Sequence, residues 1–513
     1  MGRTETTMYS PPEGEEAADQ VAVAHDWPHT ARELVAKRLE QVIFYTLLVV
    51  IALTAIPGGT VEPWWIAVFE CAVFILTALW IIAGLLGGAW FTSEHRLLVP
   101  LLALDVFAYL QTLPFGRIAK QAAGLSWQPT LSADPFETWV FTLRLLALIL
   151  AAGLLLRYTT TPRRLRALIY MVVGISVVSA LFGIARQATQ RDAPGFIFPS
   201  LGPGVGYAQF VNRNDFAFLM EMALGLLLGL IAGRGVRRER LPLYFALLLT
   251  VWVALVLSVS RGGILAMFCQ LLFLGLILSI PRPSSRARVA ARPLASSWWQ
   301  TGRSLAVRIL LCASLIAVTL AGVLWVGGES LAGRLEAMQD ESHIEAVNER
   351  KNVDRAELWR ATWQLVEDHP ITGVGFGAYW AVITEYHNAS GELLPYQAHN
   401  DYLEIMASGG LVGSVLAAWF IIAFVRHAGA RLRAAHGFRR SACLGALTGL
   451  FGVAVHSFVD FGLHVTVIAL TFAALGCIAV CGQPDTANSP LVSGRGAGDL
   501  KPKNTPFELS ENY

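Results

Sequence analysis

The chain has 513 residues, of which 55% are apolar and only 15% are charged, and its net charge is +2. Soluble domains carry about 25% charged residues. A soluble protein of this composition would expose nearly uncharged surfaces, and such surfaces aggregate. The small net charge gives no indication of a nucleic-acid partner. The composition therefore excludes an ordinary soluble protein and indicates an integral membrane protein.

Both ends of the chain are polar. The N-terminal stretch PPEGEEAADQ is acidic, whereas a cleavable signal peptide begins with basic residues followed by an apolar run. We therefore expect residues 1–40 to form a mostly disordered cytoplasmic tail. The polar composition of residues 483–513 predicts a second disordered cytoplasmic tail.

Between the tails, apolar stretches long enough to span a bilayer, or nearly so, follow one another. We predict about twelve transmembrane helices, nine within residues 41–327 and three within residues 403–482. Their expected ranges are 41–57, 64–87, 97–114, 139–156, 167–185, 216–233, 241–258, 263–280, 304–327, 403–425, 441–458 and 463–482. The predicted fold is an all-α polytopic membrane protein.

The distribution of basic residues tests the number and direction of these spans. If the N-terminus is cytoplasmic, the inner loops after the second, fourth, sixth, eighth and tenth helices carry nineteen arginines. The short outer loops carry six lysines or arginines in total. Because basic residues concentrate in cytoplasmic loops, this asymmetry predicts that both termini are cytoplasmic.

Residues 328–402 form one long outer segment between the ninth and tenth predicted helices. Segments of this length without a transmembrane helix are usually functional or disordered. The pattern DRAELWRATWQLVEDHP predicts an amphipathic helix that ends at His369 and Pro370, and the glycine-rich turn GVGFGAY follows. We therefore expect residues 328–402 to form a folded loop domain.

Four polar motifs collect on the outer side, each beside the end of a predicted transmembrane helix. They are FVNRND (210–215), SVSRGG (258–263), AHNDY (398–402) and HSFVDFGLH (456–464). Their common side predicts that the functional site lies on the outer face.

Two of these motifs contain an arginine. Arg261 lies in a turn so short that its guanidinium must lie at or within the outer interface, where an unpaired charge costs roughly 2–3 kcal/mol at depth. It could pair with an anionic ligand, or it could extend to lipid phosphates. Arg213 is a second cation at the outer edge. The same motif could also serve to begin the next helix, with Asn214 or Asp215 as its N-cap.

Three further arginines are expected on the outer side. Arg355 and Arg360 lie on the predicted loop helix, and Arg144 lies near the outer end of the helix at 139–156. A single arginine on such a helix is usually part of a solvated face. Several guanidinium groups that converge on one cavity would instead suit a phosphate or pyrophosphate, which guanidinium binds in a bidentate manner.

His399 is the titratable residue of these motifs best suited to proton transfer near neutral pH. Histidines in such positions are often helix caps or buried core residues, and Asn400 and Asp401 are good N-cap residues for the helix that follows. The position of His399, after a folded loop and before a helix with closely packing glycines, favours a catalytic role. Further candidates without a recognisable metal-site spacing are His456, Asp460 and His464.

The order and spacing of these motifs resemble the O-antigen ligase and O-antigen polymerase family of bacterial membrane glycosyltransferases. The resemblance covers about residues 205–470 and is clearest at 355–413. Its motifs are, in order, SRGG, RAELW, HPITGVGFGAY, HNDYLEIMASGGLVG and HSFVDF. The resemblance implies a GT-C-like enzyme of the bacterial inner membrane, with the loop domain and the active site on the periplasmic face.

The resemblance also implies the substrates. The donor would be a glycan on undecaprenyl pyrophosphate, and the protein would work among membrane lipids without a metal or other cofactor. The acceptor would be a sugar hydroxyl, either of lipid A-core for a ligase or of a second lipid-linked glycan for a polymerase. The sequence leaves the choice between ligase and polymerase open.

The resemblance assigns roles to individual residues. His399 matches the loop histidine of the family and would be the general base. Arg261 matches the arginine of the helix-pair motif, and either Arg355 or Arg360 matches the loop arginine. These arginines would stabilise the pyrophosphate. Substrate-binding candidates added from their position are Arg213, Asn400 and Tyr402.

A twelve-span secondary transporter is the main rival interpretation. Major facilitator transporters have two similar halves of six helices with a long inner loop between them. Here the large loop is outer, it follows the ninth predicted helix, and the two halves show no repeat. The sequence therefore favours the glycosyltransferase.

Overall fold

The computed structural model describes residues 14–56, 58–88, 90–114, 130–189, 206–279, 355–387 and 395–482, with a few positions between 309 and 321. For residues 14–30 and 93 it describes the backbone alone. The described residues form helices and one isolated antiparallel bridge between Tyr207 and Phe210. The predicted all-helical fold is confirmed for this part of the chain.

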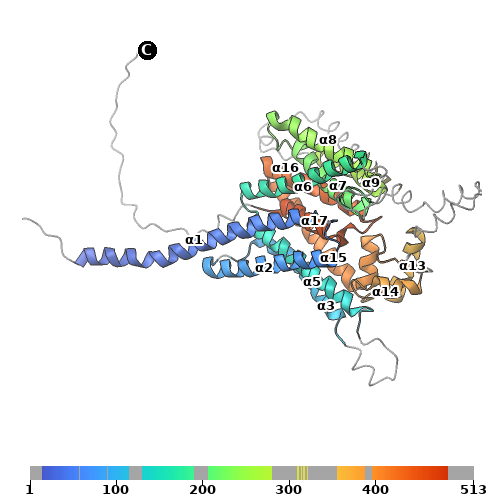
Figure 1. Ribbon diagram of the computed structural model, residues 1–513, viewed down its shortest axis with the longest axis horizontal. Coiled ribbons are helices and arrows are strands. Elements are labelled where there is room, and N and C mark those ends of the chain that lie inside the picture. The colour runs from blue at the N-terminus through green and yellow to red at the C-terminus, as the bar shows by residue number, and fades with distance from the viewer. Residues whose placement is uncertain are drawn as a thin grey trace, which may run out of the picture.

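Figure 1 shows the helices of the described residues, labelled in chain order. The first part comprises α1 (Gly14–Thr54), α2 (Pro63–Gly87), η1 (Ser93–Leu98), α3 (Val99–Gln111), α5 (Pro135–Tyr158), α6 (Pro162–Thr189), α7 (Arg213–Ala232), η2 (Arg238–Arg240), α8 (Leu241–Leu257) and α9 (Arg261–Ser279). The loop domain contributes α13 (Arg355–Asp368), α14 (Tyr379–Val382) and η4 (Ile383–Glu385). The last part comprises α15 (Asp401–Ala434), α16 (Gly437–His456), η6 (Gly462–His464) and α17 (Thr466–Val480).

Eight helices of the described chain are long and apolar enough to cross a membrane. They are α2, α5, α6, α7, α8 together with η2, α9, α15 and α16. The predicted multi-pass membrane protein is therefore confirmed, while the number twelve stays a prediction. Helix α3 has 13 residues and α17 has 15, fewer than the roughly 20 that a full span needs. Most of the predicted helix at 304–327 lies outside the described residues.

The N-terminal helix begins earlier than the sequence suggested. Helix α1 starts at Gly14, so residues 14–40, which we expected to be mostly disordered, are helical. Alanine and glutamate, which have high helix propensity, are the most frequent residues of this stretch. The rest of the predicted tails, residues 1–13 and 483–513, and the loop-domain residues 328–354 lie outside the described part.

Helix α15 is broken near its N-terminal end. Gly410 has φ 57° and ψ −152°, a conformation that glycine adopts more readily than other residues. The glycine-rich turn of the loop domain lies against this break. Val374 N donates to Ala407 O at 3.0 Å, and Leu411 N donates to Pro370 O at 2.8 Å. The loop domain therefore replaces helical hydrogen bonds that the break removes, and it is fixed against the first turns of α15.

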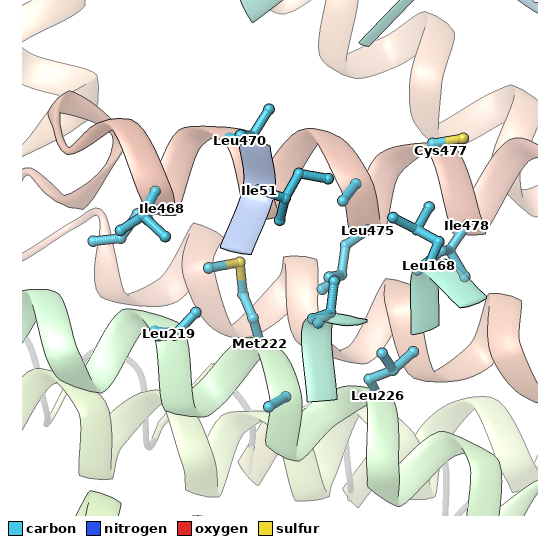
Figure 2. Packing of buried hydrophobic residues seen from close by; sticks show 14 of the residues in the cluster. Ile51, Leu168, Leu219, Met222, Leu226, Ile468, Leu470, Leu475, Cys477 and Ile478 are labelled. Atoms are coloured by element: carbon cyan, nitrogen blue, oxygen red, sulfur yellow. The ribbon is translucent and has the colours of Figure 1, made fainter. Parts of the chain in front are cut away.

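Glycines bring α7 and α16 into backbone contact. A Cβ atom on Gly225 or Gly229 would collide with the backbone of Gly449 or Gly445, respectively. Small residues allow this close approach of membrane helices, which dispersion forces then stabilise. On another side, the apolar residues of α7 meet those of α1, α6 and α17 in the main core (Figure 2). This packing fixes the end of α16 beside the start of α7, where polar residues gather.

Candidate functional site

Asp460 lies at the centre of a polar cluster where several helices end or begin. It belongs to the connection between α16 and α17 and is 1% exposed. Its Oδ2 accepts hydrogen bonds from Asn214 Nδ2, next to the start of α7, and from Arg355 Nη2 at 3.3 Å. Its Oδ1 accepts from Phe461 N at 3.0 Å and lies 3.3 Å from His399 Nδ1. A single carboxylate therefore joins three of the four polar motifs and the helix α13.

His399 lies just before α15, and its side chain is 34% exposed. The edge of its ring packs against Phe461, with ring centroids 4.6 Å apart. A carboxylate on Nδ1 fixes the orientation of an imidazole, and proton exchange can then take place at Nε2. The geometry of His399 and Asp460 therefore suits a general base with an orienting carboxylate.

Arg355 and Arg360 differ in their surroundings. Arg355 is the first residue of α13, and its Nη1 donates to Val459 O at 2.7 Å while Nη2 contacts Asp460. Arg360 is exposed, and its Nε donates to Ala356 O of the same helix at 3.1 Å. Of the two arginines that the sequence left open, Arg355 is the one that joins the cluster around Asp460.

Ser260 extends the cluster to the start of α9. Its Oγ donates to Asn214 Oδ1 at 2.8 Å and accepts from Gly263 N at 3.2 Å. Asn214 therefore bridges Ser260 and Asp460. The chain of hydrogen bonds connects α9, α7 and the segment after α16, and it brings two motifs that are far apart in sequence to one place.

The two motif arginines Arg213 and Arg261 are the first residues of α7 and α9. Arg213 is exposed and Arg261 is half-buried. Asn212 caps α7, because its side chain accepts from Asn214 N at 2.9 Å. The capping role expected for this motif is present, but Asn212 fills it rather than Asn214 or Asp215. The N-terminal ends of helices carry partial positive charge, so these arginines add to a region that favours anions.

Asn400 and Tyr402 have partners within the protein. Asn400 is the N-cap of α15, and its Oδ1 accepts from Tyr402 N and Leu403 N, each at 3.1 Å. Tyr402 donates its hydroxyl to Ala454 O at 2.8 Å, and its ring packs against Phe458. Both residues thereby fix the start of α15 beside the end of α16, next to His399.

Burial alone would raise the pKa of Asp460. The hydrogen bond from His399 and the positive charge of Arg355 outweigh burial and lower the pKa to about 2. Asp460 is therefore a carboxylate throughout the physiological pH range. A buried carboxylate needs such partners, because an unpaired charge at this depth is strongly unfavourable.

Sequence reasoning placed Asp460 among further candidates but gave it no partner. A charged residue within the barely polar linker HSFVDFGLH was the available signal, because a charge between apolar helices requires compensation. Its partners come from positions 214, 355 and 399, which the sequence does not bring together. The structure does so.

A second histidine–carboxylate pair lies deeper in the bundle. His456 Nδ1 lies 3.3 Å from Glu221 Oε2, and both side chains are almost completely buried. The His456 ring stacks on Phe218, with centroids 3.9 Å apart. A Cβ on Gly262 would collide with the same ring, so the glycine after Arg261 is needed for this packing.

The fold and the site define a multi-pass membrane protein with a polar, cation-bearing site at the ends of its helices. Residues 245–418 match the family model described as O-antigen ligase. This segment is therefore similar to the domain of that family, whose enzymes are membrane glycosyltransferases. No curated protein matches the chain. The matched segment contains Arg261, Arg355 and His399, whereas Asn214 and Asp460 lie outside it and join the site through the fold.

Proposed function

We propose that the protein is an O-antigen ligase-type glycosyltransferase that acts on the periplasmic face of the bacterial inner membrane. It would transfer a glycan from undecaprenyl pyrophosphate to a sugar hydroxyl of lipid A-core or a similar acceptor. The family match implies lipid-linked glycan substrates. The observation that carries the proposal is the pairing of the half-buried His399 with the buried carboxylate of Asp460, at 3.3 Å and beside Arg355.

In this mechanism His399 is the general base. Its Nε2 accepts the proton of the acceptor hydroxyl while the hydroxyl oxygen forms a bond to the anomeric carbon of the donor. Asp460 stabilises the imidazolium that forms and stays ionised itself. The bond between the anomeric carbon and the phosphate oxygen breaks, and its electron pair leaves with undecaprenyl pyrophosphate. Because the attack is direct, the anomeric configuration inverts.

The leaving pyrophosphate gains negative charge as this bond breaks. Arg261, Arg355 and Arg213, together with the N-terminal ends of α7 and α9, would stabilise that charge in a poorly solvated place. Guanidinium groups bind phosphate oxygens in a bidentate manner. The proposed reaction therefore needs no metal or other cofactor, and the acceptor sugar would lie between His399 and these cations.

The experiment that tests this function deletes the gene and separates the surface glycans of the cell by electrophoresis. A ligase predicts that polymer disappears from lipid A-core and accumulates on the lipid carrier. If single-repeat products appear on lipid A-core instead, the enzyme is a polymerase that uses a second lipid-linked glycan as acceptor. Unchanged surface glycans would refute both forms of the proposal.

Complementation of the deletion strain tests the residue roles. His399→Ala and Arg261→Ala should fail to restore the glycan pattern, although the proteins accumulate in the membrane. His369→Ala is a matched control, because His369 lies on the same loop domain and its Nδ1 contacts only Leu365 O in the described structure. Normal glycan from His399→Ala would end the general-base assignment, and an anomeric configuration retained in the product would exclude direct displacement.

A further inference from the structure

The backbone at His399 adopts a conformation that requires support. Its φ is 50°, in the left-handed region that residues with a side chain rarely occupy. Such a conformation costs free energy and persists only where the surrounding structure holds it. The contacts that hold this residue therefore decide where the imidazole lies.

The backbone N–H and C=O groups of Ala398, the residue before His399, both have side-chain partners. Ala398 N donates to Glu404 Oε2 at 2.9 Å, and Ala398 O accepts from Trp359 Nε1 at 3.1 Å. Ala398 is completely buried and Glu404 is 6% exposed. A hydrogen bond from an amide to a carboxylate is stronger than one between neutral groups. Glu404 on α15 and Trp359 on α13 thus clamp the backbone that carries His399.

The second oxygen of Glu404 extends this support to the segment that carries Asp460. Glu404 Oε1 lies 3.2 Å from Nε2 of His464, which belongs to η6. The segments 398–404 and 456–464 are therefore joined by histidine–carboxylate contacts in both directions. His399 pairs with Asp460, while His464 pairs with Glu404 and its Nε2 also lies 3.8 Å from Asp401 Oδ1.

We infer that Glu404 is a positioning residue: its carboxylate holds the Ala398 amide and His464, and thereby places the His399 imidazole against Asp460. The inference rests on the proposed function, since it assumes that His399 is the base. Glu404 takes no part in proton or glycan transfer. Its contribution is the fixed geometry of the base, and a displacement of about 1 Å can lower a rate on the order of 100-fold.

Two substitutions separate the geometry from the charge. Glu404→Gln keeps an oxygen that accepts from Ala398 N, whereas Glu404→Leu removes the acceptor at similar volume. With membrane lipid extract of the deletion strain as the source of donor and acceptor, Glu404→Leu should lower kcat roughly 10- to 100-fold. Its apparent KM for the lipid-linked glycan should change less than about threefold, because the substrate-binding arginines are untouched. Glu404→Gln should stay within about threefold of the wild-type kcat.

Ser414→Ala serves as the control, and Trp359→Phe is a second test variant. Ser414→Ala alters the same helix, but the Ser414 hydroxyl donates only to Gly410 O within that helix in the described structure, so normal kcat is expected. Trp359→Phe removes the other hydrogen bond to Ala398 and should lower kcat several-fold with little change in KM. This variant keeps the test decisive if Glu404→Leu fails to accumulate in the membrane.

The His399→Ala background shows whether Glu404 acts through His399. If it does, Glu404→Leu lowers the rate of the wild-type enzyme but not the residual rate of His399→Ala. Wild-type kcat in Glu404→Leu or in Trp359→Phe, or equal losses in Glu404→Leu and Glu404→Gln, would overturn the positioning role. A fully active His399→Ala protein would instead refute the general-base role of His399, and unchanged surface glycans after gene deletion would refute the proposed function, so these failures are distinguishable from a failure of the positioning role.

Discussion

Two histidine–carboxylate pairs, His399 with Asp460 and His456 with Glu221, lie near the end of α16 and share the same Nδ1–oxygen distance. In each pair the histidine Nδ1 lies 3.3 Å from a carboxylate oxygen, and both carboxylates are at most 2% exposed. The difference lies in the histidines, because the side chain of His399 is 34% exposed whereas that of His456 is 1% exposed. Residue type and distance alone would give both pairs the same role.

Access to substrate separates the two pairs. His399 can exchange a proton with a group that enters from outside, since part of its ring is exposed. His456 is enclosed by Phe218, Gly262 and Glu221, so its pair joins α7, α9 and α16 without reaching a substrate. We therefore expect changes at the first pair to alter rate and changes at the second to alter stability.

The largest effect is expected for His399→Gln. Glutamine can still form a hydrogen bond with Asp460 but cannot take up a proton, so the rate of glycan transfer should fall on the order of 1000-fold. Since the side chain is partly exposed, the unfolding temperature should change little. The rate is measured as the transfer of glycan from the membrane lipid extract. The unfolding temperature is measured by thermal unfolding in detergent. If the variant lost stability as well as rate, His399 would have a structural role like the one expected for His456.

The second-largest effect is expected for the buried pair of His456 and Glu221, the deep pair. Glu221→Leu leaves His456 buried without its carboxylate and should lower the free energy of unfolding by about 3 kcal/mol. The double variant Glu221→Leu with His456→Phe should recover part of this loss, because it replaces the whole pair by apolar side chains. Denaturant unfolding of the purified proteins gives these values. Unchanged stability with lost transfer would mean that the deep pair takes part in the chemistry.

Asp460→Asn is expected to lower the transfer rate on the order of 100-fold, since the amide cannot stabilise the imidazolium by its charge. The effect should be smaller than that of His399→Gln, because the base itself remains. The measurement is the same transfer assay, with folding checked by thermal unfolding. A rate equal to wild type would show that His399 works without its carboxylate. The pairing of His399 with Asp460 would then make no contribution to catalysis.

Asp460→Asn also tests the pH dependence of the stability of the fold. The pKa of Asp460 lies at about 2 in the folded protein, below its ordinary value of 3.8. The ionised carboxylate therefore stabilises the fold at pH values above 3.8, and this contribution is lost as the pH falls from 3.8 towards 2. The unfolding temperature of Asp460→Asn should fall less steeply over this window than that of the wild type. Parallel curves would contradict the lowered pKa.

The sequence predicted those parts of the site that depend on local patterns. The starts of α7, α9 and α15 lie within the motifs FVNRND, SVSRGG and AHNDY, because caps and short turns mark helix ends locally. The helical fold and its membrane character also followed from composition and apolar stretches. The loop helix at Arg355–Asp368 lies within the predicted amphipathic pattern.

The parts that depend on distant contacts could not be predicted in this way. Arg355 and Arg360 are five residues apart, so they point about 140° apart around a helix. Only one of them can face a given partner, and the sequence does not show where Asp460 lies. The break at Gly410 is stabilised by backbone groups of Pro370 and Ile371, which no helical period reveals. Lengths of short helices such as α3 were likewise overestimated, because apolar connections resemble helix ends.

The smallest effect is expected for Ser260→Ala. This variant tests whether a residue at the edge of the cluster around Asp460 affects the rate or the stability. The Ser260 hydroxyl is completely buried and joins Asn214 to the start of α9. Its removal leaves one acceptor and one amide without this partner, and the stability should fall by about 1 kcal/mol. Asn214 keeps its bond to Asp460, so the transfer rate should fall less than about fivefold. Thr250→Ala is a matched control, because that hydroxyl donates only to Ala246 O of its own helix in the described structure. If Ser260→Ala lowered the rate as strongly as Asp460→Asn, the residues that determine the transfer rate would have to include those at the start of α9.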